Sequence, residues 1–273
     1  MRPLKLLVIS DPAEPHLSVL KNLPDSTVVT IGNDFEALRA AAPQADVIVN
    51  GMHAGETLRR LWPIASEVQW IHSLSAGIEN MLFPELIESP VPVTNARGVF
   101  RHSLAEFVIA SVLFFAKDIR RLLRNRQAGR WEQFDMEEVR RQTLGIIGYG
   151  EIGSAAAERA KALGMKVLAV RRRPERSKGD ALLDQVYSPA QLSDLMANSD
   201  YVMVATPLTP DTRGMIGEKE LRAMKPTGVI INVGRGPVIQ EAALLRALQE
   251  KWIRGAALDV FDKEPLPEGH PFW

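Results

Sequence analysis

Three glycines near the middle of the chain have the spacing of a dinucleotide-binding turn. Gly148, Gly150 and Gly153 form the pattern Gly-x-Gly-x-x-Gly between an apolar run at 143–147 and an alanine-rich stretch at 151–163. The first glycine permits a tight turn, the second lets a pyrophosphate approach the backbone, and the third lets a helix pack closely on a sheet. Free N–H groups at the helix start would face the anion. The pattern alone is weak evidence, but its strand and helix flanks make it a predicted dinucleotide site. The predicted contacts of this turn also include Tyr149, Glu151 and Ile152.

The end of the next predicted strand, 166–170, bears on which nicotinamide dinucleotide is bound. An NAD site usually has an acidic residue there, which binds the ribose 2′-hydroxyl. This chain instead has Arg171, Arg172 and Arg173. Guanidinium groups pair with a 2′-phosphate, whereas a carboxylate would repel it. We therefore expect NADP in preference to NAD, with a solvated basic turn as the alternative interpretation.

Three later strands of the same predicted sheet end in groups that could meet a cofactor and a substrate. These strands are expected at 201–205, 228–233 and 255–258, and they end at Thr206-Pro207, Gly234-Arg235-Gly236 and Asp259, respectively. In open α/β sheets, ligands bind beyond the carboxyl ends of the strands. The planar guanidinium of Arg235 is suited to holding a carboxylate through two hydrogen bonds. The alternative is a surface arginine in a glycine turn.

The first part of the chain also alternates predicted strands and helices, which indicates a parallel sheet with helices on both faces. Its strands are expected at 4–10, 28–31, 47–50 and 68–72. The loop after the last of these strands contains Ala76 and Gly77. Their backbone N–H groups could bind a carboxylate, and an ordinary tight turn is the alternative.

The stretch 90–98 is the best candidate for a linker, because it contains two prolines and ends in a glycine. We therefore expect a substrate domain at 1–97 and a dinucleotide-binding domain at 98–273, each a doubly wound parallel α/β sheet. A helix should follow the linker, starting at a capping box formed by Ser103 and Glu106. It is apolar on most faces, which predicts that it is buried between domains or subunits.

Composition excludes several classes of protein. The chain of 273 residues suggests about two domains. Its formal net charge is zero, which gives no global indication of nucleic-acid binding. The sequence contains no cysteine, so it has no disulfides and no thiolate chemistry. No apolar run approaches the ~20 residues of a membrane helix. We expect a cytoplasmic protein with a small-molecule substrate and with no metal, nucleic-acid or membrane partner.

The motifs taken together resemble those of the D-isomer-specific 2-hydroxyacid dehydrogenases, the family of glyoxylate/hydroxypyruvate reductases and phosphoglycerate dehydrogenases. The resemblance covers nearly the whole chain. It rests on the glycine motif and on Thr206-Pro207-Leu208-Thr209, Asn232-Val233-Gly234-Arg235-Gly236, Leu258-Asp259-Val260-Phe261 and Glu264-Pro265-Leu266-Pro267. It implies a flavodoxin-like substrate domain, a Rossmann NAD(P)-binding domain and a homodimer formed through the helix at 103–117. It also implies hydride transfer between NADPH and a small 2-oxo acid such as glyoxylate or hydroxypyruvate.

The resemblance implies roles for individual residues. Arg235 matches the catalytic arginine, which holds the substrate carboxylate and polarises the 2-oxo group. Glu264 matches the carboxylate that pairs with a catalytic histidine. Ala76 and Gly77 match the loop that binds the substrate carboxylate from the other domain. The remaining matches are cofactor contacts, at Thr206, Pro207, Thr212, Val233, Gly234, Arg235 and Asp259.

The sequence departs from the family at the general acid. The family uses a histidine in a Thr-Pro-His segment, and the sequence ends at Trp273 without one. His53, His72, His102 and His270 are not expected to replace it. We therefore expect an incomplete copy of the enzyme, which binds NADPH and turns over poorly.

A second functional class stays open. Without its general acid, the chain could be a dinucleotide-sensing module that resembles the C-terminal-binding-protein corepressors. The presence of both Arg235 and Glu264 favours an enzyme.

Overall fold

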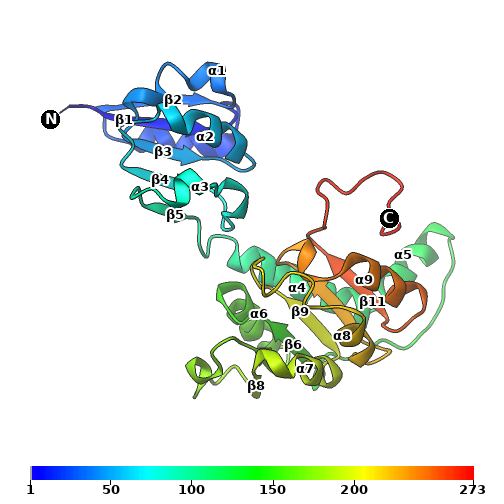
Figure 1. Cartoon of the computed structure of the whole chain (residues 1–273). Coiled ribbons are helices and arrows are strands. Elements are labelled where there is room, and N and C mark those ends of the chain that lie inside the picture. Colours follow the sequence, from blue (N-terminus) through cyan, green and yellow to red (C-terminus); the bar gives the residue numbers. More distant parts are fainter. Residues whose placement is uncertain (1) are drawn as a thin grey trace. The chain divides into compact units, whose positions relative to one another are not determined.

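The computed structural model describes residues 2–273. The chain folds into two compact units, Met1–Val99 and Phe100–Trp273 (Figure 1). The boundary between the two units therefore lies between Val99 and Phe100. This is two residues after the expected boundary, which followed Arg97.

The first unit is built on a five-stranded parallel sheet with the strand order β2-β1-β3-β4-β5. This is the flavodoxin-like order of a doubly wound sheet, so the predicted fold of this unit is confirmed. The strands are β1 (Leu4–Ile9), β2 (Thr27–Gly32), β3 (Val47–Asn50), β4 (Trp70–Ser73) and β5 (Val93–Asn95). The α-helices are α1 (Phe35–Leu38), α2 (Gly55–Leu61) and α3 (Pro84–Ile87), and the 3₁₀ helices are η1 (Pro15–Asn22), η2 (Ala42–Gln44), η3 (Trp62–Ile64) and η4 (Glu79–Met81).

The edge strand β5 lies inside the stretch that was expected to be a linker. Residues Ile71–Ser73 of β4 pair in parallel with Val93–Asn95. Prolines at 90 and 92 precede this strand, where a missing N–H group is tolerated at a sheet edge. The interpretation of 90–98 as a linker was therefore wrong for these three residues, because strand pairing across the sheet overrides the local proline signal.

The core of the first unit covers both faces of its central strands. Leu7 and Ile9 of β1 pack in the same buried cluster as Leu38 and Leu58 of the helices. On the other face, Leu6 and Val8 pack with Leu17 of η1. Burial on both faces explains why β1 reads as a continuous apolar run.

The second unit is built on a six-stranded parallel sheet with the order β11-β10-β9-β6-β7-β8. Numbered within the unit, this is the Rossmann order 3-2-1-4-5-6 read from the other edge, so the second predicted fold is confirmed as well. The strands are β6 (Thr143–Ile147), β7 (Lys166–Val170), β8 (Gln185–Tyr187), β9 (Tyr201–Val204), β10 (Val229–Asn232) and β11 (Gly255–Leu258). The α-helices are α4 (Arg101–Ala116), α5 (Ile119–Gln127), α6 (Glu151–Ala162), α7 (Leu192–Asn198), α8 (Glu218–Ala223) and α9 (Glu241–Gln249), and the 3₁₀ helices are η5 (Pro174–Ser177), η6 (Pro189–Gln191) and η7 (Gly236–Val238).

Helix α4 begins earlier than the sequence pattern indicated. Its first helical residue is Arg101 and its N-cap is Phe100, which makes no side-chain capping bond. Ser103 therefore lies within the first turn, and the predicted capping box was wrong. The buried stripe of α4 includes Val108 and Val112, which pack in one cluster with α6. None of the described helices combines the length and apolar character needed to cross a bilayer.

Candidate functional site

The glycine turn joins β6 to α6 as the sequence predicted. Gly148 has φ +97°, and a Cβ there would lie 2.8 Å from the backbone of Ala205 and Thr206. A Cβ on Gly153 would lie 2.8 Å from the Gly148 carbonyl oxygen, whereas a Cβ on Gly150 would meet nothing within 4 Å. Gly150 is the N-cap of α6, so the space in front of it faces the helix N-terminus. The turn thus leaves open the place that a pyrophosphate would occupy.

A cavity of ≈ 610 Å³ lies beside this turn. That volume is within the range of small-molecule sites, roughly 300–1,000 Å³. The predicted cofactor residues that line it are Gly148, Tyr149, Gly150, Arg171, Arg172, Arg173, Thr206, Pro207 and Thr212. The predicted residues outside its lining are Glu151, Ile152, Gly153, Val233, Gly234, Arg235 and Asp259.

The residues around the cavity fit an NAD(P) dinucleotide. The hydroxyl oxygen of Thr206 is buried and has no hydrogen-bond partner in the described part of the chain. Buried polar atoms are nearly always hydrogen-bonded, so this hydroxyl is suited to a ligand in the adjoining cavity. The open space at Gly150 provides the backbone approach that a pyrophosphate needs.

Arg171 is held in place at one wall of the cavity. Its Nη1 donates a hydrogen bond to the Oγ of Ser177 over 2.7 Å, and its guanidinium lies 5.8 Å from the centre of the Tyr149 ring. The Tyr149 hydroxyl donates to Asp180 over 2.9 Å. Burial raises the pKa of Tyr149, and the hydrogen bond to Asp180 adds to the rise. Tyr149 therefore stays a neutral donor beneath the Arg171 guanidinium.

Arg176 also lines the cavity, and the sequence analysis missed it. It belongs to η5, which directly follows the three predicted arginines. The signal was present, because the basic run continues as Arg-Arg-Arg-Pro-Glu-Arg. Pro174 and Glu175 separate Arg176 from the three consecutive arginines, and η5 brings it back to the cavity wall.

Arg235 stands in a turn that is organised by the last residue of β10. Asn232 is 1% exposed, and its side chain accepts a hydrogen bond from the Gly234 N–H and donates one to the Arg235 carbonyl, both over 3.0 Å. The Arg235 Nη1 donates to the Gly234 carbonyl over 2.8 Å. The role of Asn232 was not predicted from the sequence, although this residue lies two positions before Gly234-Arg235-Gly236.

The Arg235 turn abuts two other parts of the second unit. A Cβ on Gly234 would lie 2.8 Å from the Thr206 carbonyl oxygen. A Cβ on Gly236 would lie 2.0 Å from the backbone of Phe261. The turn is therefore packed between the strand end that lines the cofactor cavity and the segment that carries Glu264.

Glu264 and Asp259 lie in the irregular segment after β11. One carboxylate oxygen of Glu264 accepts a hydrogen bond from the Phe261 N–H over 2.9 Å. The backbone N–H of Asp259 donates to the Asn232 carbonyl over 3.0 Å. Partial burial raises the pKa of Asp259, and the nearby Glu264 carboxylate raises it further. The two acidic side chains are thus coupled electrostatically at the same end of the sheet.

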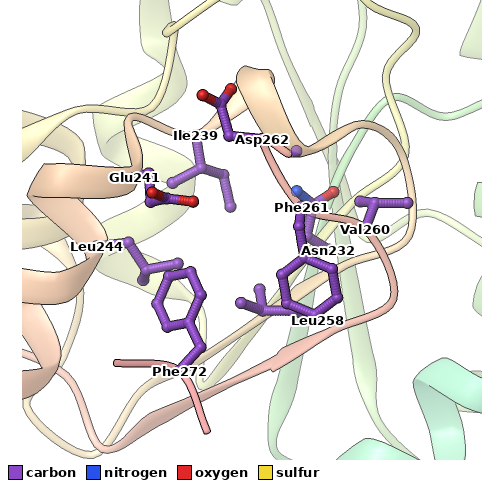
Figure 2. A pocket seen from close by; sticks show the side chains of 10 residues that line it. Asn232, Ile239, Glu241, Leu244, Leu258, Val260, Phe261, Asp262 and Phe272 are labelled. Carbon is purple, nitrogen blue, oxygen red and sulfur yellow. The ribbon is translucent and has the colours of Figure 1, made fainter. Parts of the chain in front are cut away.

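A small pocket lies behind this segment (Figure 2). Phe261 and Phe272 face one another across it with ring centres 6.3 Å apart, and Asn232 and Leu244 contribute to its wall. Its volume is ≈ 10 Å³, which is about the space that one water molecule requires. We interpret it as a packing gap and not as a substrate site.

The raised pKa of Asp259 predicts a pH dependence of stability. The folded state holds this proton more tightly than the unfolded state, so stability falls as pH rises from the ordinary pKa of about 3.9 through the folded value. Asp259→Asn should therefore unfold at a higher temperature than the unchanged chain at neutral pH. The difference should shrink as pH falls toward 4. Thermal unfolding of both chains across this pH range measures it, and a difference that is constant with pH would contradict the assignment.

The predicted substrate loop belongs to the first unit. Ala76 and Gly77 follow β4, at the carboxyl end of the sheet, and Asn95 at the end of β5 donates its side-chain amide to the Ala76 carbonyl over 2.5 Å. The structure thus places Ala76 and Gly77 in one unit, and Arg235 with the cofactor cavity in the other.

Three of the four histidines near the expected cleft or the end of the sequence have partners of their own. His72 is hydrogen-bonded to Thr94, and His102 to Arg159. His270 lies 3.3 Å from a carboxylate oxygen of Glu241. No group of His, Cys, Asp and Glu across residues 2–273 has an arrangement that could hold a metal ion.

Comparison with known proteins agrees with this arrangement. Residues 109–273 match the family described as D-isomer specific 2-hydroxyacid dehydrogenase, NAD binding domain. A glyoxylate reductase of Korarchaeum cryptofilum is 33% identical, over 94% of this chain and 82% of its own length. A D-isomer specific 2-hydroxyacid dehydrogenase family protein from Aeromonas salmonicida has a TM-score of 0.86 with 26% identity, covering 99% of this chain and 86% of its own.

A third similar protein is a D-isomer specific 2-hydroxyacid dehydrogenase from Xanthobacter autotrophicus, solved in complex with NADPH and MES. It has a TM-score of 0.80 with 27% identity, covering 98% of this chain and 84% of its own. From the site and these similarities together, the chain belongs to the D-isomer specific 2-hydroxyacid dehydrogenase family, the NAD(P)-dependent oxidoreductases that act on the CH–OH group of 2-hydroxy acids.

Proposed function

We propose that this protein reduces a small 2-oxo acid, such as glyoxylate or hydroxypyruvate, to the 2-hydroxy acid with NADPH. The observation that carries the proposal is the position of the Thr206 backbone. A Cβ on Gly148 would meet its N–H side, and a Cβ on Gly234 would meet its carbonyl. The cofactor turn and the Arg235 turn are therefore packed against the same residue. The glyoxylate reductase relatives support this substrate class.

Side-chain and backbone groups have separate roles in the proposed reaction. The Arg235 guanidinium binds the substrate carboxylate through charge-assisted hydrogen bonds and polarises the 2-oxo group. The Ala76 and Gly77 N–H groups bind the same carboxylate. Asp259 and the Val233 backbone orient the nicotinamide carboxamide.

Bound NADPH supplies a hydride to C2, and the former carbonyl oxygen takes up a proton. The second carboxylate oxygen of Glu264 has no partner within residues 2–273 and is suited to pair with a protonated imidazole. In this proposal, Glu264 orients a proton-donating imidazole, and none of His53, His72, His102 and His270 is assigned that role. One hydride and one proton convert the 2-oxo acid to the 2-hydroxy acid and leave NADP⁺.

The proposal includes a preference for NADP over NAD. Arg171, Arg172, Arg173 and Arg176 line one cavity, and the hydrogen bond from Arg171 to Ser177 orients that guanidinium before a ligand binds. A preorganised cationic wall favours the 2′-phosphate over a free 2′-hydroxyl. The NADPH complex of the Xanthobacter relative supports this choice of cofactor.

We further propose a homodimer in the cytoplasm, assembled through α4, α5 and the segment after α5. Trp131 is 96% exposed, and Leu122, Leu123 and Met136 are exposed as well. Exposed apolar groups of this kind mark association surfaces. Light scattering should give twice the chain mass of 30.2 kDa, and Trp131→Asp should shift the mass toward one chain. A single-chain mass at all concentrations would contradict the dimer.

The experiment that tests the reaction follows NADPH and NADH oxidation by the purified chain with glyoxylate and with hydroxypyruvate. We expect slow oxidation that requires the 2-oxo acid and is faster with NADPH than with NADH at equal concentration, because no histidine of this sequence is assigned as the general acid. NADPH binding without turnover, accompanied by oligomer formation, would instead favour a dinucleotide-sensing protein. No binding of either dinucleotide would contradict both.

A further inference from the structure

The loop after β4 carries two backbone donors that the described part of the chain does not use. Neither the Ala76 N–H nor the Gly77 N–H donates a hydrogen bond within residues 2–273. The loop is nevertheless held at its start, because the Ser75 N–H donates to the Oγ of Ser73, which is 1% exposed. Two adjacent free donors on a held loop are available to bind an anion.

The carbonyl groups of the same two peptides are both bonded to the end of β5. The Ser75 carbonyl accepts a hydrogen bond from the Ala96 N–H over 3.2 Å. The Ala76 carbonyl accepts one from the side-chain amide of Asn95 over 2.5 Å. The end of β5 is itself positioned by the pairing of Asn95 with Ser73 in the sheet.

The geometry of a peptide then determines where the two donors point. In a planar trans peptide, the carbonyl of one residue and the N–H of the next lie on opposite edges. Binding the Ala76 carbonyl to Asn95 therefore directs the Gly77 N–H away from β5. Binding the Ser75 carbonyl to Ala96 directs the Ala76 N–H away from β5 in the same manner.

We propose that Asn95 is a positioning residue for the substrate carboxylate, which acts by holding the Ala76–Gly77 peptide so that the Gly77 N–H faces the substrate. This inference rests on the proposed function, which assigns Ala76 and Gly77 to that carboxylate. Asn95 itself does not touch the substrate. Its contribution is to remove the rotational freedom of one peptide before the anion binds.

The Ser75–Ala76 and Ala76–Gly77 peptides are held by different kinds of donor, so the contribution of the Asn95 side chain can be measured separately. The bond to the Ser75 carbonyl comes from a backbone N–H, so it survives any side-chain change at Asn95. The bond to the Ala76 carbonyl comes only from the side chain. Replacing Asn95 should therefore release the Gly77 donor and leave the Ala76 donor in place.

The test measures binding of oxalate to the NADP-saturated full chain by calorimetry. Oxalate carries a carboxylate beside a second carbonyl oxygen, as the substrate does, and its binding requires no proton transfer. For Asn95→Ala we expect the oxalate Kd to rise by about tenfold, as for the loss of one hydrogen bond to a charged group. Asn95→Asp should raise it further, because its carboxylate cannot donate to the Ala76 carbonyl and keeps the size of the original side chain.

Two controls separate positioning from a general loss of structure. The NADPH Kd should not change in either variant, because the cofactor cavity lies in the other unit. Asn33→Ala removes a side chain of the same type from the same end of the sheet, after β2, and should leave oxalate binding unchanged. Where turnover is measurable, the Asn95 variants should raise KM for glyoxylate more than they lower kcat.

The outcomes distinguish this inference from the function on which it rests. If the unchanged chain binds NADPH but not oxalate, the proposed carboxylate-binding site is contradicted, and so is the role of Asn95. If the unchanged chain binds oxalate and both folded Asn95 variants bind it equally well, the proposed function stands and the role of Asn95 is overturned. A rise in the NADPH Kd that matches the rise for oxalate would also overturn it.

Discussion

Arg235→Gln is expected to lower kcat/KM for glyoxylate by about 10³-fold, since it removes two charged hydrogen bonds of roughly 1.5–3 kcal/mol each. Glutamine keeps much of the side-chain length but has neither the charge nor the planar fork that binds both carboxylate oxygens. The turn itself should survive, because Asn232 bonds to the backbone of Gly234 and Arg235 and not to the guanidinium. The effect on NADPH affinity should be much smaller.

Steady-state kinetics with glyoxylate and titration with NADPH measure the two effects separately, and oxalate binding gives the same comparison without chemistry. Arg235→Lys keeps the positive charge but not the planar fork. Its kcat/KM should lie between those of Arg235→Gln and the unchanged chain. Arg59→Gln, an exposed arginine on α2, is the matched control and should behave as the unchanged chain. Near-normal kcat/KM in Arg235→Gln would remove this residue from the proposed mechanism.

Arg171→Asp is expected to weaken NADPH binding by about 10²-fold and to improve NADH binding relative to NADPH. The change replaces a guanidinium that Ser177 holds at the cavity wall with a carboxylate that repels the 2′-phosphate. The same carboxylate can accept a hydrogen bond from the 2′-hydroxyl of NADH. The ratio of the two affinities should therefore reverse, although each remains measurable.

Parallel titrations with NADPH and NADH give this ratio directly. Lys178→Asp makes the same change of charge just after η5, at a residue that does not line the cavity. Long-range charge effects would act in both variants, whereas pairing with the phosphate acts only in Arg171→Asp. An unchanged cofactor ratio in Arg171→Asp would contradict the pairing.

The two folds, and the parts of the site whose residues are neighbours in the chain, are predictable from the amino-acid pattern. Gly148 and Gly153 were predictable, because the conformation of a turn and the close packing of the helix it starts depend on neighbours a few residues away. The central strands β1, β6 and β9 were predictable because burial on both faces makes them continuous apolar runs. Arg235 was recognisable from the glycines on either side of it.

The residues that support these motifs from distant parts of the sequence become evident only in the folded chain. Strand β5 lies in a stretch whose prolines and glycine are typical of a linker, and its three residues gain their extended structure from pairing with β4. The bond of Asn95 to Ala76 joins residues 19 apart in the sequence. Thr206 lies between Gly148 and Gly234 because β9 pairs with both β6 and β10. Strand order in a parallel sheet brings such residues together, and it depends on long-range packing that local spacing does not encode.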